Sequence, residues 1–298
     1  MMTNFKIDLL TQGKKLTKYF YNFLRKAKTS YDFHAGLRKK LRKNEAILVH
    51  QMGKVGSSTI VASLEALNLN TPIYHTHTLN PQYIESRLIQ LKAEGRKLKT
   101  GSHMITSQYL SKVIAKGLNG RSWKVITLVR EPIIRNISDY FQNIDNYLPN
   151  FIDRYKEGSL KIDEITNNFL ENYRHDRPLY WFNQEIKEVF NIDVLSVDFP
   201  KQKGYKIFAN EHLNLLVIRL EDLNRCYADA FKEFLGIEQF KLTAANVAAG
   251  KQYDIAYKEI KDTIELPHWY LEKMYSSQYV RHFYTHEEIE NFRLKWSR

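Results

Sequence analysis

The sequence predicts an α/β fold with three layers, in which helices flank a central parallel sheet. From Glu45 onward, short apolar runs alternate with stretches of helical periodicity, a pattern typical of buried parallel strands and their crossover helices. The chain has 298 residues, 43% of them hydrophobic and 13% aromatic, so it can bury a large core. No repeat, low-complexity tract or Pro/Gly linker interrupts this part, and we expect one domain over residues 45–298.

The first 44 residues differ from the rest in charge. They hold twelve Lys and Arg against Asp8 and Asp32, a local balance of +10, whereas the whole chain carries +12. Apolar residues recur at helical spacing between the basic ones, namely Phe5, Leu9, Leu16, Phe20, Phe23 and Leu24. We therefore expect a basic amphipathic segment over residues 1–44. It is a candidate for peripheral contact with an anionic membrane, and the alternative is a solvated helix that packs on the domain.

Three apolar runs are candidates for central strands, namely Ala46 to His50, Val125 to Val129 and Leu215 to Arg219. A further strand is expected at Tyr74 to Thr78, with His75 and His77 on one side of it. Apolar periodicity predicts helices over residues 57–67, 81–94, 107–116, 132–143, 162–173, 225–235, 256–263, 267–275 and 287–296. This alternation of strands and helices favours parallel pairing.

Cys226 is the single cysteine, so no intramolecular disulfide can form and a reducing compartment is expected. No apolar run reaches the roughly 18 residues of a membrane-spanning helix, and no apolar leader with a cleavage site stands at the N-terminus. We expect a cytoplasmic protein, peripheral to the membrane if residues 1–44 bind lipid. Because the basic excess lies in that one segment, we expect no nucleic-acid partner.

A phosphate-binding loop is expected directly after the first strand, where the chain reads Gln51, Met52, Gly53, Lys54, Val55, Gly56, Ser57, Ser58, Thr59. A strand, a glycine turn and a helix N-terminus expose backbone N–H groups that bind phosphate. Lys54 adds charge, and the three hydroxyls can donate hydrogen bonds. The lysine precedes Ser57 by three residues, unlike the Walker motif, in which it stands next to Ser/Thr. An ordinary glycine–serine helix cap is the alternative.

The second candidate segment follows the strand that ends at Val129. Arg130 stands at the strand end, Pro132 suits the first turn of a helix, and Ser138 comes eight residues after the arginine. The planar guanidinium of arginine can hold a phosphate through two hydrogen bonds. Alternatively, Arg130 pairs with Glu131 or Glu221, and Ser138 is a neutral helix residue.

Together these segments resemble sulfotransferases that use 3′-phosphoadenosine-5′-phosphosulfate (PAPS). Over about Ala46 to Arg298 the chain is similar to bacterial sulfotransferase-like proteins described as putative capsular polysaccharide synthesis proteins, with further matches at 215–223 and 270–284. The resemblance implies a P-loop-like fold and transfer of a sulfuryl group from PAPS to a hydroxyl of a glycan-like acceptor. It also implies that residues 53–59 bind the 5′-phosphosulfate, with Lys54 catalytic, that Arg130 and Ser138 bind the 3′-phosphate, and that no metal is needed.

The general base stays open between several candidates. The segment from Lys97 to His103 resembles the Lys-Thr-His segment of cytosolic sulfotransferases, with Gly101 and Ser102 inserted. It favours His103 as the base, and His77, His75 or a carboxylate are alternatives. His75 and His77 could also form half of a metal site, but no third ligand has suitable spacing. Lys251 is a candidate for closing over the nucleotide.

The acceptor is less defined by the sequence. Aromatic residues at 178–182, with Trp269 and Tyr270, could stack on sugar rings or belong to the core. A P-loop kinase or nucleotide hydrolase is the first alternative function, although the loop spacing argues against it. A membrane-associated protein that binds nucleotide without catalysis is the second.

Overall fold

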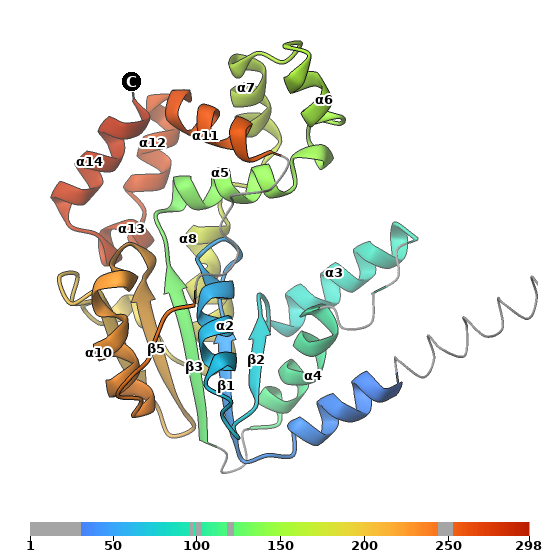
Figure 1. The fold of residues 1–298 in the computed structure, drawn as a ribbon, viewed down its shortest axis with the longest axis vertical. Coiled ribbons are helices and arrows are strands. Elements are labelled where there is room, and N and C mark those ends of the chain that lie inside the picture. The colour runs from blue at the N-terminus through green and yellow to red at the C-terminus, as the bar shows by residue number, and fades with distance from the viewer. Residues whose placement is uncertain (1–30, 96–97, 99–102, 118–121, 244–252, 298) are drawn as a thin grey trace, which may run out of the picture.

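The computed structural model describes residues 31–95, 98, 103–117, 122–243 and 253–297, and its centre is a five-stranded sheet (Figure 1). The strand order is β2-β1-β3-β5-β4. The bounds of the strands are Glu45–His50 (β1), Ile73–Thr76 (β2), Ser122–Val129 (β3), Tyr205–Ala209 (β4) and Leu213–Arg219 (β5). The predicted α/β class with a central sheet is confirmed.

The three predicted central strands lie within β1, β3 and β5, and these pair in parallel. Their apolar residues are buried along almost the whole run, and Leu48, Val125 and Leu215 are all 0% exposed. Continuous burial is expected where helices cover both faces of a sheet. The predicted strand at Tyr74 to Thr78 corresponds to β2, which starts one residue earlier and ends at Thr76, so His77 lies just beyond the strand.

The predicted parallel pairing holds for the central strands but not at one edge of the sheet. Strand β4 pairs antiparallel with β5, and only residues 210–212 separate the two. A connection this short can join only antiparallel neighbours, since a parallel pair needs a crossover of a dozen or more residues. The sheet is therefore mostly parallel with one antiparallel edge.

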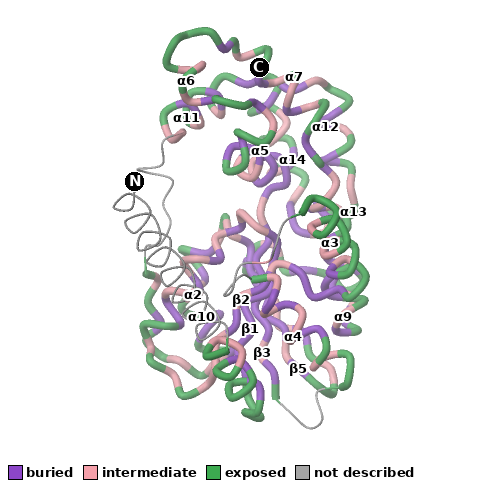
Figure 2. The backbone as a smooth tube through the Cα atoms, turned by 90° about the vertical axis from the view of Figure 1, so that its right-hand side faces the viewer, coloured by how far each residue is buried: buried purple, intermediate pink, exposed green. Residues whose placement is uncertain are grey.

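Helices cover both faces of the sheet (Figure 2). Helices α2 (Ser57–Ala66) and α10 (Leu223–Leu235) lie on one face, and α4 (His103–Ala115) and α9 (Glu188–Phe190) lie on the other. Helix α3 (Pro81–Ala93) connects β2 to α4, and the side chain of its N-cap residue accepts hydrogen bonds from two backbone N–H groups. The N-terminal part of α4 extends four residues beyond its predicted start.

A second group of helices lies beyond the carboxyl ends of the parallel strands (Figure 1). Nearest to the strands is α5 (Pro132–Gln142), which follows β3 after two residues. The others are α6 (Phe151–Lys156), α7 (Ile162–Asn172), α8 (Arg177–Trp181), α11 (Asp254–Thr263), α12 (His268–Tyr275), α13 (Gln278–Phe283) and α14 (His286–Trp296). Of these, α6, α8 and α13 are short and were not predicted as separate helices.

The order of the strands creates a natural ligand-binding position. The chain leaves β1 toward β2 on one side, whereas β3 lies on the other side of β1. In open α/β sheets, ligands bind at the carboxyl ends of the strands where the direction of winding reverses in this way. Both predicted phosphate-binding segments begin at this edge, one after β1 and the other after β3.

The predicted basic segment falls mostly outside the described residues, which begin at 31. Residues 31–40 are helical, and Leu37 and Leu41 are each 7% exposed and belong to the main hydrophobic core. Its last part therefore packs on the domain. Membrane contact by residues 1–44 stays a prediction.

Candidate active site

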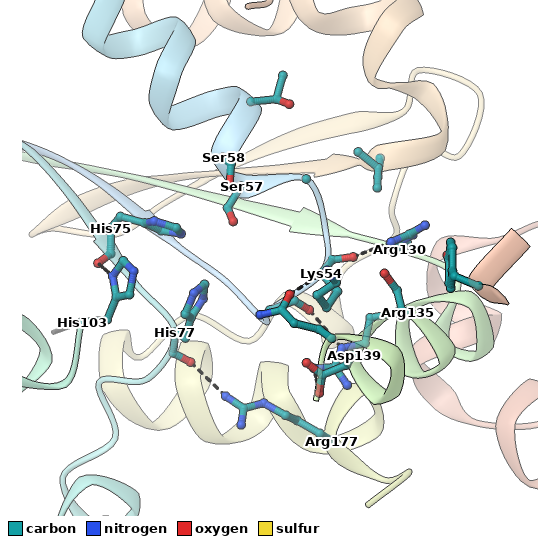
Figure 3. A pocket seen from close by; sticks show the side chains of 17 residues that line it. Lys54, Ser57, Ser58, His75, His77, His103, Arg130, Arg135, Asp139 and Arg177 are labelled. Carbon is teal, nitrogen blue, oxygen red and sulfur yellow. Dashed lines mark hydrogen bonds and ion pairs between the residues drawn. The ribbon is translucent and has the colours of Figure 1, made fainter. Parts of the chain in front are cut away.

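A cavity of about 630 Å³ opens at the carboxyl ends of the strands. The segments that follow β1 and β3, together with β2 and the segment after it, form one wall, and α5 forms another (Figure 3). Its lining residues are Gly53, Lys54, Gly56, Ser57, Ser58, Thr59, His75, His77, His103, Arg130, Arg135, Ser138, Asp139, Gln142, Arg177, Leu220 and Tyr257. The cavity brings together the two predicted phosphate-binding segments and the three candidate histidines.

The loop after β1 adopts a strained backbone. Lys54 has a φ of 72° and Gly56 a φ of 89°, both in the left-handed region, which costs roughly 1–2 kcal/mol for a residue with a side chain. A Cβ atom at Gly56 would also lie 2.7 Å from Cδ1 of Leu220. Such strain in a loop residue is common at functional sites, and Gly56 is required here by both conformation and space.

Two arginines fix the carbonyl groups of this loop. Arg135 Nε donates to the Gly53 carbonyl oxygen at 3.0 Å, and Arg130 Nη1 donates to the Lys54 carbonyl oxygen at 2.7 Å. The Lys54 ammonium donates to Gln142 Oε1 at 2.7 Å. Helix α2 then begins at Ser57, and the first turn of a helix presents N–H groups that its own backbone does not use. The loop is thus held in place before any ligand binds.

The arginine at the strand end forms no direct ion pair with a described carboxylate, although its charge counteracts the rise that burial causes in the pKa of Glu221. Glu131 instead caps α5 by accepting from the N–H groups of Ile133 at 2.9 Å and Ile134 at 2.6 Å. Glu221 accepts from the Glu131 N–H at 2.8 Å. The Arg130 guanidinium, which lines the cavity, keeps its charge available for an anion.

Buried tyrosines support the junction between β3 and α5. Tyr279 donates to the Arg130 carbonyl oxygen at 2.8 Å and accepts from the Arg130 N–H at 3.3 Å. Tyr275 donates to Glu131 Oε1 at 2.8 Å. Burial raises the pKa of Glu131 to about 7, although its hydrogen bonds act in the opposite direction. These contacts fix the backbone from which Arg130 projects.

Three cavity residues on α5 were not predicted. Arg135, Asp139 and Gln142 follow the i, i+4, i+7 spacing, and Ser138 falls beside them, so they share one helix face. Arg135 is 2% exposed and pairs with Asp139 at 3.2 Å; it also donates to Tyr173 Oη at 2.8 Å. A polar stripe on an otherwise apolar helix was the sequence signal that could have identified them.

The histidines form the opposite side of the cavity (Figure 3). The ring centroids of His75 lie 4.8 Å from those of both His77 and His103, and His77 and His103 are 5.2 Å apart. His77 Nδ1 lies 3.0 Å from the Gln51 carbonyl oxygen, and His103 Nδ1 lies 3.1 Å from the His75 carbonyl oxygen. A carbonyl can only accept, so Nδ1 is the donor in both rings and Nε2 carries the basic lone pair of the neutral tautomer.

Burial separates the three rings as bases. It lowers the pKa of His75 to about 3, with further lowering by the neighbouring His77 and His103. Burial also lowers the pKa of His77 to about 4, against the effect of its hydrogen bond to Gln51. Both rings are therefore neutral and weakly basic near pH 7. His103 is exposed at the start of α4, so it does not share this burial.

Two lining residues come from later parts of the chain and had no sequence signal that singled them out. Arg177 stands at the start of α8, and Tyr257 lies on α11. The ring centroid of Tyr257 is 5.4 Å from that of Phe141 on α5. With Arg177 included, the described lining residues comprise one lysine, three arginines and one carboxylate, that of Asp139. The cavity is strongly positive and suited to anions.

The segment after β2 is held by a buried carboxylate. Glu185, in the π-helical turn η2 (Phe182–Lys187), accepts from the N–H groups of Leu79 at 2.6 Å and Asn80 at 3.0 Å. Its other partners include Thr78 and His50. Burial opposes ionisation, yet these hydrogen bonds lower the pKa of Glu185 overall. The carboxylate fixes the turn that carries His77.

Some predicted residues do not face the cavity. The Val55 side chain is 0% exposed within the core, so only its backbone can contact a ligand. Trp181 and Phe182 are each 2% exposed and Tyr270 is 0% exposed; of the two alternatives for these residues, sugar stacking or the core, the structure places them in the core. Trp269 is exposed but does not line the cavity. Lys251 and most of the segment from Lys97 to Ser102 lie outside the described residues.

A second hollow of about 380 Å³ adjoins the histidines. It lies between the helical residues 31–40, β2 and α4, and its lining includes Asp32, Lys40 and Thr106. His75 and His103 line both hollows. His103 therefore stands where two ligands could meet.

The described residues lack the features of a metal centre and of a membrane-spanning helix. They contain no cluster of three or more His, Cys, Asp or Glu side chains arranged to hold a metal ion. None of their helices combines the length and apolar character required to cross a bilayer.

Comparison with known proteins gives one family. No curated protein and no solved structure matches the chain. A family model matches residues 152–285. This range includes Arg177, Leu220 and Tyr257 from the cavity wall, together with Tyr275 and Tyr279, which support the β3–α5 junction. Residues 152–285 match the model of the family described as putative capsular polysaccharide synthesis protein, so the resemblance to that family is confirmed for this part of the chain.

Proposed function

We propose that this chain is a sulfotransferase that moves a sulfuryl group from PAPS to a hydroxyl of a glycan-like acceptor. One observation carries the proposal: the loop after β1 and the Arg130 segment after β3 line a single positive cavity where the winding of the sheet reverses. The donor has two separate phosphate groups, and the cavity has two separate sets of phosphate-binding groups. The match to a capsular polysaccharide synthesis family supports a glycan as acceptor.

The residues divide between the two ends of the donor. The first turn of α2, the hydroxyls of Ser57, Ser58 and Thr59, and Lys54 would bind the 5′-phosphosulfate. Arg130 and Ser138 would bind the 3′-phosphate. Gly53, Val55 and Gly56 contribute backbone only. This pairing of a strand, a loop and a helix N-terminus is the basis for assigning a P-loop-like fold.

PAPS supplies a sulfuryl group bonded to a phosphate that leaves as part of 3′,5′-ADP. His103 Nε2 takes the proton of the acceptor hydroxyl as the oxygen forms its bond to sulfur. The bond between sulfur and the 5′-phosphate oxygen breaks, and that oxygen gains negative charge. Lys54 stabilises this charge. No step requires a metal ion. His77 is the second candidate base, and burial makes it the weaker one.

We place the reaction in the cytoplasm, with residues 1–44 as the segment that would contact an anionic membrane. The main alternatives are a P-loop kinase or nucleotide hydrolase and a nucleotide-binding protein without catalysis. The first requires magnesium-dependent ATP binding. The second binds 3′,5′-ADP but forms no sulfated product.

Calorimetry without added metal tests the proposal directly. The wild-type protein should bind 3′,5′-ADP in the micromolar range and bind ATP much more weakly. Lys54→Ala and Arg130→Ala should each abolish transfer. Arg130→Ala should do so mainly by weakening the binding of 3′,5′-ADP. Lys92→Ala, an exposed substitution on α3 outside the cavity, should bind like wild type. Preference for ATP with magnesium, or wild-type affinity and rate in both cavity variants, would place the function elsewhere.

The base is tested separately from donor binding. His103→Ala should retain affinity for 3′,5′-ADP and lower the rate of transfer from PAPS by a factor of about 100. An unchanged rate would assign the base to His77 or to Asp139, the carboxylate of the cavity.

A further inference from the structure

Arg177 is a cation in the cavity wall that the donor does not require. Its Nη2 donates to the His77 carbonyl oxygen at 3.2 Å and its Nη1 donates to Tyr83 Oη at 3.2 Å. Its guanidinium carbon also lies 5.5 Å from the centre of the Tyr83 ring. All of these partners are neutral, and Nε is buried without a hydrogen-bond partner among the described residues.

Carboxylates close to Arg177 in the fold are engaged by other groups. The adjacent Asp176 pairs with Lys273 at 2.7 Å. Asp139, across the cavity, pairs with Arg135 at 3.2 Å. No described carboxylate forms an ion pair with Arg177. A partly buried cation without a counter-ion is unfavourable, so an anionic ligand at this position would remove that cost.

The position of Arg177 separates it from the groups assigned to the donor. It lies beyond His77 (Figure 3), on the histidine side of the cavity, whereas Arg130 lies on the opposite side of Lys54. The two phosphate positions of the donor already have the α2 loop and Arg130. An anion at Arg177 would therefore belong to the acceptor, whose hydroxyl must reach the histidines.

We propose that Arg177 selects an acidic acceptor sugar by binding its carboxylate while a hydroxyl of that sugar faces the histidines. This inference rests on the proposed sulfotransferase function and names the class of acceptor. Phosphate and sulfate esters present three oxygens. In this cavity the groups assigned to bind phosphate combine several hydrogen-bond donors, as in the loop before α2. At Arg177 the cavity offers a single guanidinium, whose planar N–H groups match the two oxygens of a carboxylate. The acceptor is thus expected to contain a uronic acid.

A matched pair of monosaccharides tests this selection by NMR titration of the full chain saturated with 3′,5′-ADP. Methyl glucuronide carries the carboxylate, and methyl glucoside replaces it with a neutral hydroxymethyl group. Wild-type protein should bind the glucuronide about tenfold more tightly, as expected for a charge-assisted hydrogen bond. The Arg177 guanidinium resonances should shift only with the glucuronide.

Two variants and one control complete the test. Arg177→Gln should lose the preference, and Arg177→Lys, which keeps the charge but not the planar group, should retain part of it. Both should keep wild-type affinity for 3′,5′-ADP, which also verifies that they fold. Arg174→Gln is the control, because Arg174 is exposed in the same segment and does not line the cavity; its preference should equal that of wild type.

The failure of this inference differs from failure of the proposed function. Equal affinity for the two sugars, or no binding of either, with 3′,5′-ADP binding intact would overturn the acidic-acceptor assignment alone. Weaker 3′,5′-ADP binding in Arg177→Gln would also overturn it by assigning Arg177 to the donor. Tighter binding of a sugar whose only charged group is a sulfate ester than of the glucuronide, lost in Arg177→Gln, would overturn the carboxylate assignment in favour of that ester. Absence of 3′,5′-ADP binding in wild type would overturn the proposed function itself.

Discussion

The two sides of the cavity are held in place by different chemistry. On the loop side, Arg130 and Arg135 donate charged hydrogen bonds to the carbonyls of residues 54 and 53. On the histidine side, the rings of His77 and His103 are oriented by neutral backbone carbonyls. The loop side thus gathers positive charge, whereas the rings of His75 and His77 on the other side stay neutral near pH 7 because burial lowers the pKa of each.

This difference corresponds to the two tasks of the proposed reaction. A phosphosulfate carries several negative charges and is bound best by fixed cations and N–H groups. Removing a proton from a hydroxyl needs a base with an accessible lone pair, which a neutral imidazole with a fixed Nδ1–H provides. Substitutions on the two sides should therefore have different consequences.

The largest effect is expected on the loop side, at Gly56. Gly56→Ala adds a Cβ atom 2.7 Å from Leu220 Cδ1 at a φ of 89°. Strain and overlap together should lower the free energy of unfolding by about 3 kcal/mol, and displacement of the loop should weaken 3′,5′-ADP binding by about 100-fold or more. Chemical unfolding and calorimetry would measure the two effects.

Gly158→Ala separates strain from overlap. Gly158 has a φ of 66° but nothing within 4 Å of the position of a Cβ atom, so its substitution should cost only about 1 kcal/mol. It should leave 3′,5′-ADP binding unchanged. Similar costs for the two glycines would show that the contact with Leu220 does not constrain the loop.

A smaller effect is expected at Arg135, which joins the loop to α5. Arg135→Met keeps much of the buried volume but removes the hydrogen bonds to Gly53 and Tyr173 and the pair with Asp139. We expect a loss of about 2 kcal/mol of stability and about tenfold weaker 3′,5′-ADP binding, since the Gly53 carbonyl loses its donor.

The control for this arginine is Arg154→Gln. Arg154 pairs with Glu164 at 2.8 Å, and the side chains are 34% and 43% exposed. Exposed pairs contribute less than about 1 kcal/mol, and this one lies outside the cavity. If Arg135→Met bound 3′,5′-ADP as tightly as wild type, the loop would hold its conformation without the arginine.

The sequence predicted parts of both sides of the cavity, namely the loop after β1 and the three histidines. The loop side was predictable because Gly53 to Thr59 are contiguous and directly follow an apolar strand. The central strands were predictable for the same reason, since continuous apolar runs are typical of a sheet covered on both faces. The antiparallel β4 was missed because its short, half-buried sequence lacks such a run.

The remaining site residues required the tertiary structure. Arg177 and Tyr257 reach the cavity from helices that are distant in sequence. Arg135 appeared to be an ordinary helix residue, and only the path of α5 past the loop gives it a role. For the aromatic residues the sequence left sugar stacking and core packing open, and the tertiary structure buries both Trp181 and Tyr270.

The smallest expected effect is on the histidine side and appears only in acid. Because burial lowers the pKa of His77 to about 4 from an ordinary 6.5, the unfolded chain binds a proton below pH 6.5 that the folded protein does not. Unfolding therefore becomes easier as the pH falls from about 6.5 toward 4. His77→Asn, whose amide can still donate to Gln51, should remove about 2 kcal/mol of this loss at pH 5.

Chemical unfolding at pH 7 and pH 5 measures this difference, with His212→Asn, at an exposed turn outside the cavity, as the control. Wild type and the control should lose similar stability between the two pH values, and His77→Asn should lose less. An unchanged loss in His77→Asn would mean that His77 binds its proton in the folded protein near the ordinary pH. The ring of His77 would then carry positive charge below neutral pH, and the contrast between the fixed cations around the loop and the neutral histidine rings would disappear.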